Sequence, residues 1–314
     1  MTTALIFPGQ GSQAVGMGRS LADAFPVAKA VFDEVDAALS QKLSTLMWEG
    51  AAEELTLTAN AQPALMAVSL AVVRVLEAEA GLDLGRDAAF VAGHSLGEYS
   101  ALAAAGTFSV SDAARLLRIR GDAMQKAVPA GQGAMAALLG AELDLAREIA
   151  AAAAQGEVCE AANDNGGGQV VLSGSKAAID RAIALATERG VKRAMLLPVS
   201  APFHCALMQP AAEAMQEALS KIAMQAPVVP VMANVGAAPL SDPEAIRASL
   251  VAQVTGTVRW RECVQAMAAA GVDDFVELGS GKVLAGLVKR IAAGTATASV
   301  GTAEDIAAYK ARKG

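Results

Sequence analysis

One pentapeptide in the chain, Gly93-His94-Ser95-Leu96-Gly97, has the residue types and the setting of a serine nucleophile. It follows a short apolar run at 88–92 and precedes an alanine-rich segment at 98–105. We interpret these flanks as a buried strand and a helix, so the serine would sit on a sharp turn with its hydroxyl exposed. Glycine on both sides lets strand and helix approach closely. The alternative is an ordinary glycine-flanked turn, because the pentapeptide alone is common in unrelated chains.

A serine hydroxyl needs a neighbouring base, and the chain contains two histidines. His94 adjoins Ser95 on the turn, where neighbouring side chains diverge, so it is poorly placed to take the proton. His204 lies in a loop-like segment, Ser200-Ala201-Pro202-Phe203-His204-Cys205, and catalytic groups are commonly mounted on such loops. We therefore predict that His204 is the base, against the alternative of a merely packed or surface histidine. No acidic residue lies near it in sequence, so a main-chain or amide carbonyl could hold the imidazole instead.

Arg120 is predicted to point inward from a helix. Arg115, Arg118 and Asp122 fall on the opposite, solvated face at about 100° per residue. An unpaired buried charge is strongly unfavourable, so the guanidinium needs an anionic partner. That partner is either an internal Asp or Glu or the carboxylate of a substrate, which a two-pronged guanidinium binds well. The apolar residues that share its face are Ala113, Leu116, Leu117, Ala123 and Met124.

Composition narrows the class of protein. The chain has 314 residues, enough for one large domain or two smaller ones, and its 54% hydrophobic content is inflated by alanine. No run approaches the ~18 apolar residues of a spanning helix, so we expect no membrane segment. A net charge of −7 disfavours nucleic acid as the principal ligand. Cys159, Cys205 and Cys263 form no C-x-x-C pair, which favours reduced thiols in a cytoplasmic protein and argues against a zinc site.

Alternating strand-like and helical segments predict an α/β fold with a mainly parallel sheet. The expected strands lie at 4–7, 88–92, 228–233 and 274–278, and long helical patterns include 63–80 and 211–224.

The middle of the chain has a different pattern, β-α-β-β-α-β, which is that of a ferredoxin-like unit. We therefore predict a large domain in two parts, 1–127 and 198–314, with a small α+β domain inserted at 128–197. The six elements of the insertion are expected at 133–139, 144–154, 158–162, 169–173, 176–189 and 192–197.

Two other glycine-rich stretches have some features of phosphate-binding motifs. Pro8-Gly9-Gln10-Gly11-Ser12-Gln13-Ala14 loosely fits a dinucleotide fingerprint, but the acidic residues that follow lie inside an amphipathic helix at 31–39. A better role is a tight loop that presents a main-chain N–H beside the serine, as an oxyanion hole requires. Gly279-Ser280-Gly281-Lys282 lacks the spacing and the following Ser or Thr of a P-loop, which excludes that motif.

Taken together, these segments resemble the malonyl-CoA:acyl-carrier-protein transacylase family of fatty-acid synthesis. The resemblance runs in family order from the first predicted strand almost to the C-terminus, so it covers essentially the whole chain. The matching segments are Phe7-Pro8-Gly9-Gln10-Gly11-Ser12-Gln13, Gly93-His94-Ser95-Leu96-Gly97-Glu98-Tyr99, Arg118-Ile119-Arg120-Gly121, Ser200-Ala201-Pro202-Phe203-His204, Gln253-Val254-Thr255 and Glu277-Leu278-Gly279-Ser280-Gly281-Lys282-Val283-Leu284.

The resemblance implies a hydrolase-like large domain with a parallel sheet and an inserted ferredoxin-like α+β domain, in agreement with the pattern above. It implies ping-pong transfer of a malonyl group from malonyl-CoA to the phosphopantetheine thiol of acyl carrier protein, through a malonyl-serine intermediate. No metal or redox cofactor is expected, because thioester exchange is nearly isoenergetic. We also expect a cytoplasmic monomer with no nucleic-acid or membrane partner.

The resemblance also assigns roles by position. Ser95 would be the acylated nucleophile and His204 its base, and Arg120 would hold the malonyl carboxylate. Main-chain N–H groups of Gln10 and Leu96 would form the oxyanion hole.

Gln253 would lie in the site, where in this family a main-chain carbonyl orients the histidine. Two departures concern loop geometry alone: Thr257 stands where the family usually has proline, and Gly167-Gly168 replaces a usual proline-containing loop.

Two rival functions use some of the same residues. A serine hydrolase has the same turn and histidine, so these residues do not show whether the acyl group passes to water or to a thiol. An inward Arg120 favours a carboxylated acyl group. A non-enzymatic scaffold is disfavoured because serine, histidine and arginine occur together. The sequence leaves open whether the carrier serves fatty-acid or polyketide synthesis.

A carrier protein of this type is acidic, and so is this chain, so docking needs a local basic patch. The candidate pairs are Lys192 with Arg193 and Lys289 with Arg290, against the alternative of ordinary solvated charges.

Overall fold

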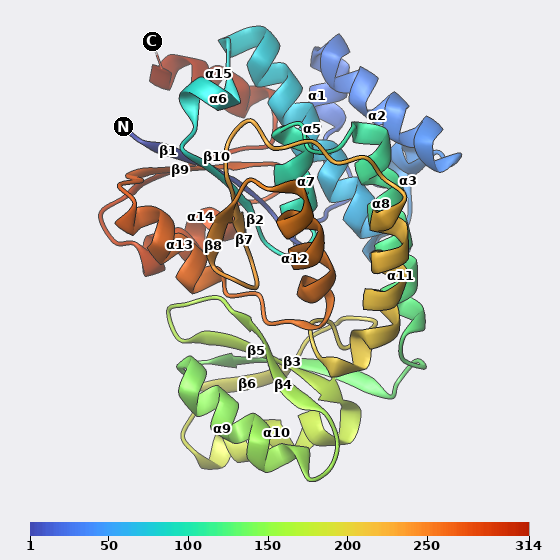
Figure 1. Cartoon of the computed structure of the whole chain (residues 1–314), viewed down its shortest axis with the longest axis vertical. Helices are drawn as coiled ribbons and strands as arrows, with labels where there is room; N and C mark the ends of the chain where they lie inside the picture. The colour runs from blue at the N-terminus through green and yellow to red at the C-terminus, as the bar shows by residue number, and fades with distance from the viewer. Residues whose placement is uncertain (314) are drawn as a thin grey trace.

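The computed structural model describes residues 1–313 of the chain. Two β-sheets form the framework, and each carries its own helices (Figure 1). The larger sheet is built from both ends of the chain, and the smaller one from its middle.

The larger sheet has six strands in the order β10-β9-β1-β2-β7-β8. Every neighbouring pair is parallel except β7 and β8, which are antiparallel. This confirms the predicted α/β class with a mainly parallel sheet. The strands are β1 (Thr3–Phe7), β2 (Phe90–Gly93), β7 (Val231–Ala233), β8 (Ala238–Leu240), β9 (Asp274–Leu278) and β10 (Ala296–Val300).

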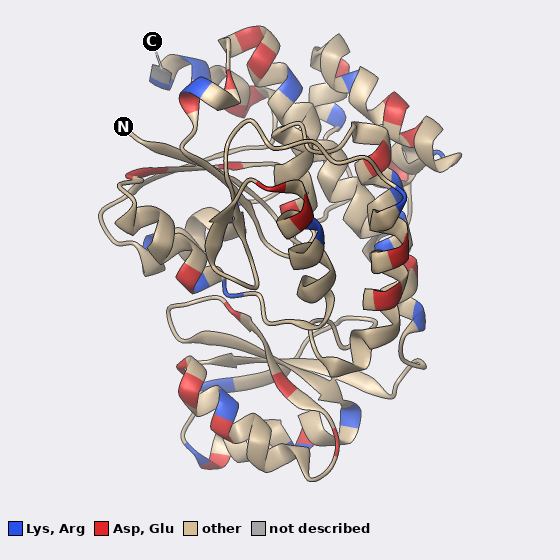
Figure 2. Ribbon diagram, viewed as in Figure 1, with Lys and Arg blue, Asp and Glu red and all other residues tan. Residues whose placement is uncertain are grey.

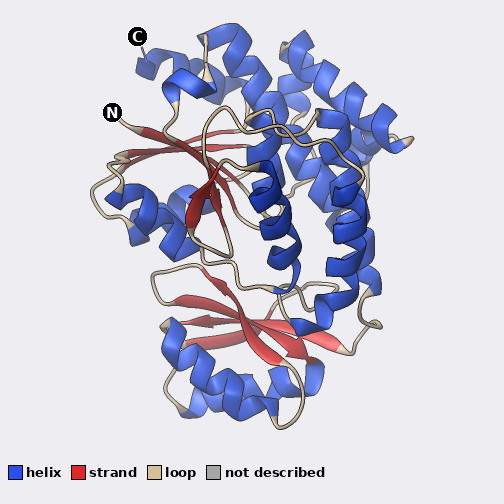
Figure 3. Ribbon diagram, viewed as in Figure 1, coloured by secondary structure: helices blue, strands red, loops and turns tan. Residues whose placement is uncertain are grey.

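Helices cover both faces of this sheet (Figure 3). They are α1 (Arg19–Ala24), α2 (Pro26–Leu39), α3 (Leu43–Glu49), α4 (Ala52–Thr56), α5 (Thr58–Ala80), α6 (Leu84–Asp87), α7 (Gly97–Ala104), α8 (Val110–Lys126), α11 (Gln209–Ser220), α12 (Pro243–Thr255), α13 (Trp260–Ala269), α14 (Val283–Ile291) and α15 (Ala303–Lys313), with a short 3₁₀ turn at Ala206–Met208.

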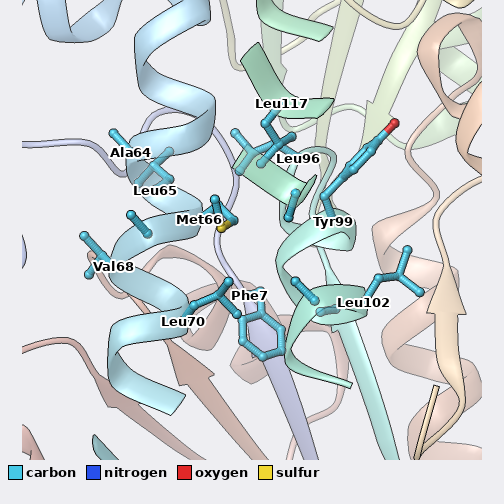
Figure 4. Packing of buried hydrophobic residues seen from close by; sticks show 14 of the residues in the cluster. Phe7, Ala64, Leu65, Met66, Val68, Leu70, Leu96, Tyr99, Leu102 and Leu117 are labelled. Atoms are coloured by element: carbon cyan, nitrogen blue, oxygen red, sulfur yellow. The ribbon is translucent and has the colours of Figure 1, made fainter. Parts of the chain in front are cut away.

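The alternation of side chains along β1 explains the two covered faces, because successive residues of a strand point to opposite sides. Leu5 and Phe7 join the core shared with α5, α7 and α8, whereas Ala4 and Ile6 join a second cluster with α13 and α14. Figure 4 shows Phe7 in the first core with side chains of α5 and α7. Both faces of the central strand are therefore apolar, as parallel sheets require.

Helix α5 is the central helix of the first core. Within residues 1–313 it is the one helix long and apolar enough to cross a membrane by length and composition, and 89% of its apolar window is buried inside the protein. Helix α5 is therefore a core helix, because its apolar surface packs on neighbouring helices and strands.

The smaller sheet has four antiparallel strands in the order β4-β5-β3-β6. With a helix after its first and third strands, it has the ferredoxin-like arrangement that the sequence predicts, and α9 and α10 cover its outer face (Figure 3). The domain limits at 128 and 197 stay a prediction. The elements are β3 (Gly133–Leu139), α9 (Leu143–Ala154), β4 (Cys159–Asp164), β5 (Gln169–Ser175), α10 (Lys176–Glu188) and β6 (Arg193–Leu196).

Some predicted boundaries were wrong. The strand expected at 228–233 begins only at Val231, because Val228 is exposed and bonds Ala105, and Pro230 has no N–H for the ladder. Strands β8 and β10 were missed, since both are edge strands with few fully buried residues. Helix α5 begins at Thr58 rather than at position 63, so Pro63 lies inside its first turns.

Candidate active site

Ser95 occupies a tight turn between β2 and α7. A Cβ on Gly93 would lie 1.9 Å from the main chain of Gly97, and one on Gly97 would lie 2.3 Å from the carbonyl oxygen of Phe7, so both positions require glycine. Ser95 itself has a φ of 53°, in the left-handed region that a serine rarely adopts. The backbone therefore holds the serine at a strained turn of the kind seen in nucleophile elbows.

His204 contacts the serine directly. Its Nε2 lies 2.7 Å from Ser95 Oγ, and its Nδ1 lies 2.8 Å from the carbonyl oxygen of Gln253. A carbonyl can only accept, so Nδ1 carries the proton and Nε2 is left to accept the serine proton. Burial, followed by the charge of Arg120, lowers the pKa of His204 to about 3, which keeps the ring neutral at physiological pH. Like Ser95, His204 has a positive φ, 58°.

His94 takes no part in this pair. Its Nε2 lies 2.9 Å from Oδ1 of Asn165, which belongs to the loop between β4 and β5. Burial lowers the pKa of His94, so this ring is also neutral and serves to link the two sheets.

Arg120 points inward as predicted and is 1% exposed. Its Nη1 donates to Oε1 of Gln62 at 2.7 Å, and its Nη2 donates to Oε1 of Gln253 at 2.9 Å and to Ser95 Oγ at 3.2 Å. Across residues 1–313, no carboxylate oxygen lies within 4.0 Å of an Arg120 nitrogen, so Arg120 does not form an internal ion pair. The guanidinium is held by neutral amides instead, with its Nε–H buried and without an acceptor in the described chain.

The close approach of two helices brings Arg120 to this position. A Cβ on Gly121 would lie 2.6 Å from Cα of Ala59, so α8 passes α5 at a distance that only glycine allows. Burial lowers the pKa of Arg120, and the guanidinium remains a cation because its ordinary pKa is so high.

Two residues that line the cavity with Ser95 have main-chain N–H groups without acceptors in the described part of the chain. Leu96 follows Ser95 at the start of α7, and Gln10 lies in the loop after β1. Neither N–H donates to another group in the described part of the chain, and both residues line the cavity that contains Ser95. This placement fits the predicted oxyanion hole.

The cavity has a volume of about 460 Å³ and lies between the two sheets. Ser95, His204 and Arg120 line it from the larger part, and Met135 of β3 lines it from the smaller one. It is large enough for a short acyl group and part of a thioester arm. Among the described residues no group of three or more His, Cys, Asp or Glu side chains is placed to hold a metal ion.

Sequence reasoning missed three polar residues around this cavity. Asn234 follows β7 and accepts from the Ser95 N–H at 2.8 Å, while its Nδ2 donates to the Gly93 carbonyl at 2.7 Å. Gln62 bonds Arg120, but the predicted helix began one residue too late to include it. Glu98 lies buried on α7. A polar residue at the carboxyl end of a parallel strand was the signal available for Asn234.

Arg118 corrects one expectation about α8. It is half-buried rather than solvated, because it donates to side-chain oxygens of Asn60 and Gln41. Its pKa is lowered by burial.

Both candidate docking pairs are exposed. Lys192 and Arg193 lie at the start of the edge strand β6, and Lys289 and Arg290 lie at the end of α14. In the part of the chain that the structure describes, none of the four forms an ion pair. Charges of both signs are spread over the outer helices of the molecule (Figure 2), so any docking attraction must be local.

Comparison with known proteins identifies the family to which this chain belongs. The acyl transferase domain family matches residues 4–307. The malonyl CoA-acyl carrier protein transacylase of Bacillus subtilis is 46% identical over 304 residues, which are 96% of this chain and 94% of the relative. The chain belongs to the malonyl-CoA:acyl-carrier-protein transacylase family. It is therefore an acyltransferase, and the resemblance drawn from its motifs is confirmed.

Solved structures of this transacylase family have the same fold. The acyl-carrier-protein S-malonyltransferase of Bartonella henselae is 58% identical and superimposes with a TM-score of 0.96, covering 98% of both chains. A malonyl-transacylase in complex with a type II polyketide-synthase acyl-carrier protein is 41% identical, with a TM-score of 0.96 over 99% of this chain and 100% of that one.

Proposed function

We propose that this chain transfers a malonyl group from malonyl-CoA to the phosphopantetheine thiol of acyl carrier protein through a malonyl-serine intermediate. One observation carries the proposal: Ser95 Oγ lies between a neutral base, 2.7 Å away at His204, and a buried cation, 3.2 Å away at Arg120. In malonyl-CoA the free carboxylate is one methylene from the thioester carbonyl. Its counter-charge must therefore lie beside the nucleophile, where Arg120 is.

In the first half-reaction, Ser95 Oγ attacks the thioester carbonyl and its proton passes to Nε2 of His204. The carbonyl oxygen becomes an oxyanion, which the N–H groups of Gln10 and Leu96 stabilise. The C–S bond then breaks, and the sulfur of CoA leaves with the proton from His204. The products are free CoA and an ester between the malonyl group and Ser95.

In the second half-reaction, the thiol of the carrier's phosphopantetheine arm gives its proton to His204 and attacks the ester. Ser95 leaves and recovers the proton. The carboxylate of the malonyl group stays bound to Arg120 during this step, which keeps the ester carbonyl beside His204. No step in this sequence uses a metal or redox cofactor.

Several features support acyl carrier protein as acceptor and the cytoplasm as location. A relative of the same fold was solved with an acyl-carrier protein bound. The three cysteines are free and buried, as expected in a reducing compartment. That the enzyme acts as a monomer stays a prediction.

The test is the mass of the intact protein after brief mixing with malonyl-CoA or, separately, acetyl-CoA. We expect a malonyl adduct on Ser95 that forms faster than any acetyl adduct, that is absent from Ser95→Ala, and that moves to holo-carrier protein when this is added. A malonyl adduct that persists in Ser95→Ala would contradict the proposal. An adduct that water removes faster than carrier thiol would make the chain a hydrolase.

A further inference from the structure

One buried carboxylate beside the site has no part in the steps above. Glu98 lies three residues after the nucleophile on α7 and is 1% exposed. Its Oε2 accepts from the main-chain N–H of Asn234 at 3.0 Å and from Nε2 of Gln253 at 2.9 Å. Its Oε1 is buried and has no hydrogen-bond partner among the described residues. One oxygen of the carboxylate therefore has hydrogen-bond partners, and a proton on the other oxygen, Oε1, would break no existing hydrogen bond.

A single amide joins Glu98 to Arg120. The guanidinium donates to Oε1 of Gln253 at 2.9 Å, and the same amide donates through Nε2 to Glu98 at 2.9 Å. This bridge transmits the attraction between two buried groups that are not in direct contact. A buried guanidinium without a counter-charge is strongly unfavourable, and Glu98 is the carboxylate whose charge acts on it. When Glu98 is ionised, its negative charge compensates the positive charge of Arg120 in the empty site.

Among the residues that the structure describes, Glu98 is the one carboxylate whose charge acts on Arg120. Strands β1, β2 and β7, which pack on α7, carry no titratable side chain, and the charged residues of α5 lie near its far end, at Arg74, Glu77 and Glu79. The titratable groups that do interact with Glu98 or Arg120 are Tyr99 on α7, Cys263 on α13 and the neutral His204.

Binding of a second carboxylate changes this balance. A malonyl carboxylate on Arg120 would place two negative groups on one buried cation. Like charges in a low-dielectric site do not both stay ionised, and the one that is not bonded to the cation directly is the one to protonate. Burial raises the pKa of Glu98 to about 7 in the empty site, so a proton is readily available to it from solvent.

We propose that Glu98 is the resident counter-charge of Arg120 and that it takes up one proton from solvent when the acyl carboxylate binds. This inference rests on the proposed function, because it needs a carboxylate on Arg120. It makes Glu98 a determinant of specificity for carboxylated acyl groups: binding of these groups weakens as the pH rises above neutrality, whereas binding of uncharged acyl groups does not. Glu98 also keeps the empty site from holding an uncompensated cation.

Calorimetric titration of Ser95→Ala with malonyl-CoA tests this, since this variant binds without turnover. Titrations at pH 8 in buffers of different ionisation heat give the number of protons taken up. Linkage predicts about 0.5 to 1 proton for malonyl-CoA beyond that for acetyl-CoA, which shares every titratable group of CoA but has no carboxylate. In Ser95→Ala with Glu98→Gln, the extra uptake should vanish.

Glu277→Gln in the same background is the matched control. Glu277 is also fully buried with a raised pKa, but its carboxylate accepts from N–H groups at the start of α14 and has no bridge to Arg120. Proton uptake should therefore be unchanged in this variant. Uptake that persists in Glu98→Gln would place the proton elsewhere, on His204 for example, and would overturn the inference.

The two proposals fail in different ways. If malonyl-CoA binds no more tightly than acetyl-CoA, and Arg120→Ala changes nothing, the carboxylate contact of the proposed function is wrong and this inference with it. If malonyl-CoA binds more tightly through Arg120 but takes up no extra proton, the function stands and the role of Glu98 is wrong.

A second measurement needs no variant at Glu98. In the wild-type enzyme, the ratio of kcat/KM for malonyl-CoA to that for acetyl-CoA should fall as the pH rises from 6.5 to 8. One linked proton gives up to about tenfold per pH unit above the pKa of the group. A ratio that is flat over this range would overturn the inference.

Discussion

The two sheets of this enzyme differ in what they bury. The six-stranded sheet ends in polar groups, with Gln10, Ser95 and Asn234 after β1, β2 and β7, and charged groups are buried beside them. The core of the four-stranded sheet consists of alanine, valine, leucine and isoleucine with one cysteine. Parallel strands bring their carboxyl ends, and the loops after them, to one edge. The antiparallel sheet has no such edge, and it lines the cavity with Met135 of β3 and Asn163 of β4.

Two residues of the candidate site have a strained backbone. Ser95 and His204 both have a positive φ, which costs about 1–3 kcal/mol at each residue. The amides of Gln253 and Asn234 hold the main chain of Ser95 from both sides, with bonds at 3.0 and 2.8 Å. The larger sheet thus carries strained and polar residues that its large apolar core can support.

The two histidines bond different parts of the molecule: His204 bonds Ser95, and His94 bonds Asn165 of the smaller part. We expect His204→Ala to lower the rate of acyl-enzyme formation by about 10³-fold or more, as for loss of a general base. His94→Ala should stay within about tenfold of wild type, since it removes only a link between sheets. The rates come from quenched-flow mass spectrometry, and the opposite order would show that the base is misassigned.

Arg120→Ala should lower the rate of acylation by malonyl-CoA by about 10²-fold, because a buried carboxylate would lose its only cation. Acetyl-CoA has no carboxylate and should lose little. Competition between the two thioesters measures the ratio in one reaction, with thermal unfolding as a control for folding. Equal losses for both, at unchanged stability, would mean that Arg120 is only structural.

Asn234→Ala should lower kcat by about tenfold and leave the KM for malonyl-CoA nearly unchanged. The amide holds the N–H of Ser95 and the carbonyl of Gly93, and loss of buried partners costs about 1–3 kcal/mol. Steady-state kinetics and urea unfolding measure both effects. A change confined to KM would contradict a role in positioning the nucleophile.

The pH dependence of stability should report the burial of neutral His204. Its pKa is about 3 in the folded protein and about 6.5 when unfolded, so the unfolded state binds more protons between these values. The contribution of His204 is therefore complete above pH 6.5 and is lost as the pH falls, by up to about 1.4 kcal/mol per pH unit.

Glu98 acts in the opposite direction, because its pKa is raised from 4.5 to about 7 and its contribution is lost as the pH rises. The free energy of unfolding of wild type must therefore be compared with that of His204→Ala at pH 6.5 and pH 5. At pH 5, the free energy of unfolding of wild type should have fallen relative to that of His204→Ala, because wild type loses the contribution of His204. A gap that is constant with pH would contradict the buried, neutral state of the ring.

The smallest effect is expected at the surface. Reversal of the charges at Lys192, Arg193, Lys289 and Arg290 should raise the KM for carrier protein by about three- to tenfold at low salt, because complementary charge mainly raises the on-rate. Acylation by malonyl-CoA should be unaffected. An unchanged carrier KM at low ionic strength would place the docking surface elsewhere.

The sequence by itself determined most of the elements and pointed to three residues of the candidate site. The glycines around Ser95 can be recognised locally, because a tight strand-to-helix turn admits only glycine at those positions. The direction of Arg120 follows from helical periodicity, and the choice of His204 from there being two histidines. Each of these signals lies within one short segment of chain.

Only the tertiary structure decided what these residues bond. Gln62 and Gln253 hold Arg120 across separations of 58 and 133 residues, and Asn234 meets Ser95 across 139. A glutamine or asparagine has no periodic or compositional signature that marks it as a partner, because its role depends on which distant group the fold brings within 3 Å. For the same reason, only the structure could show that the direct partners of Arg120 in the described chain are amides and a hydroxyl, with no carboxylate in ion-pair contact.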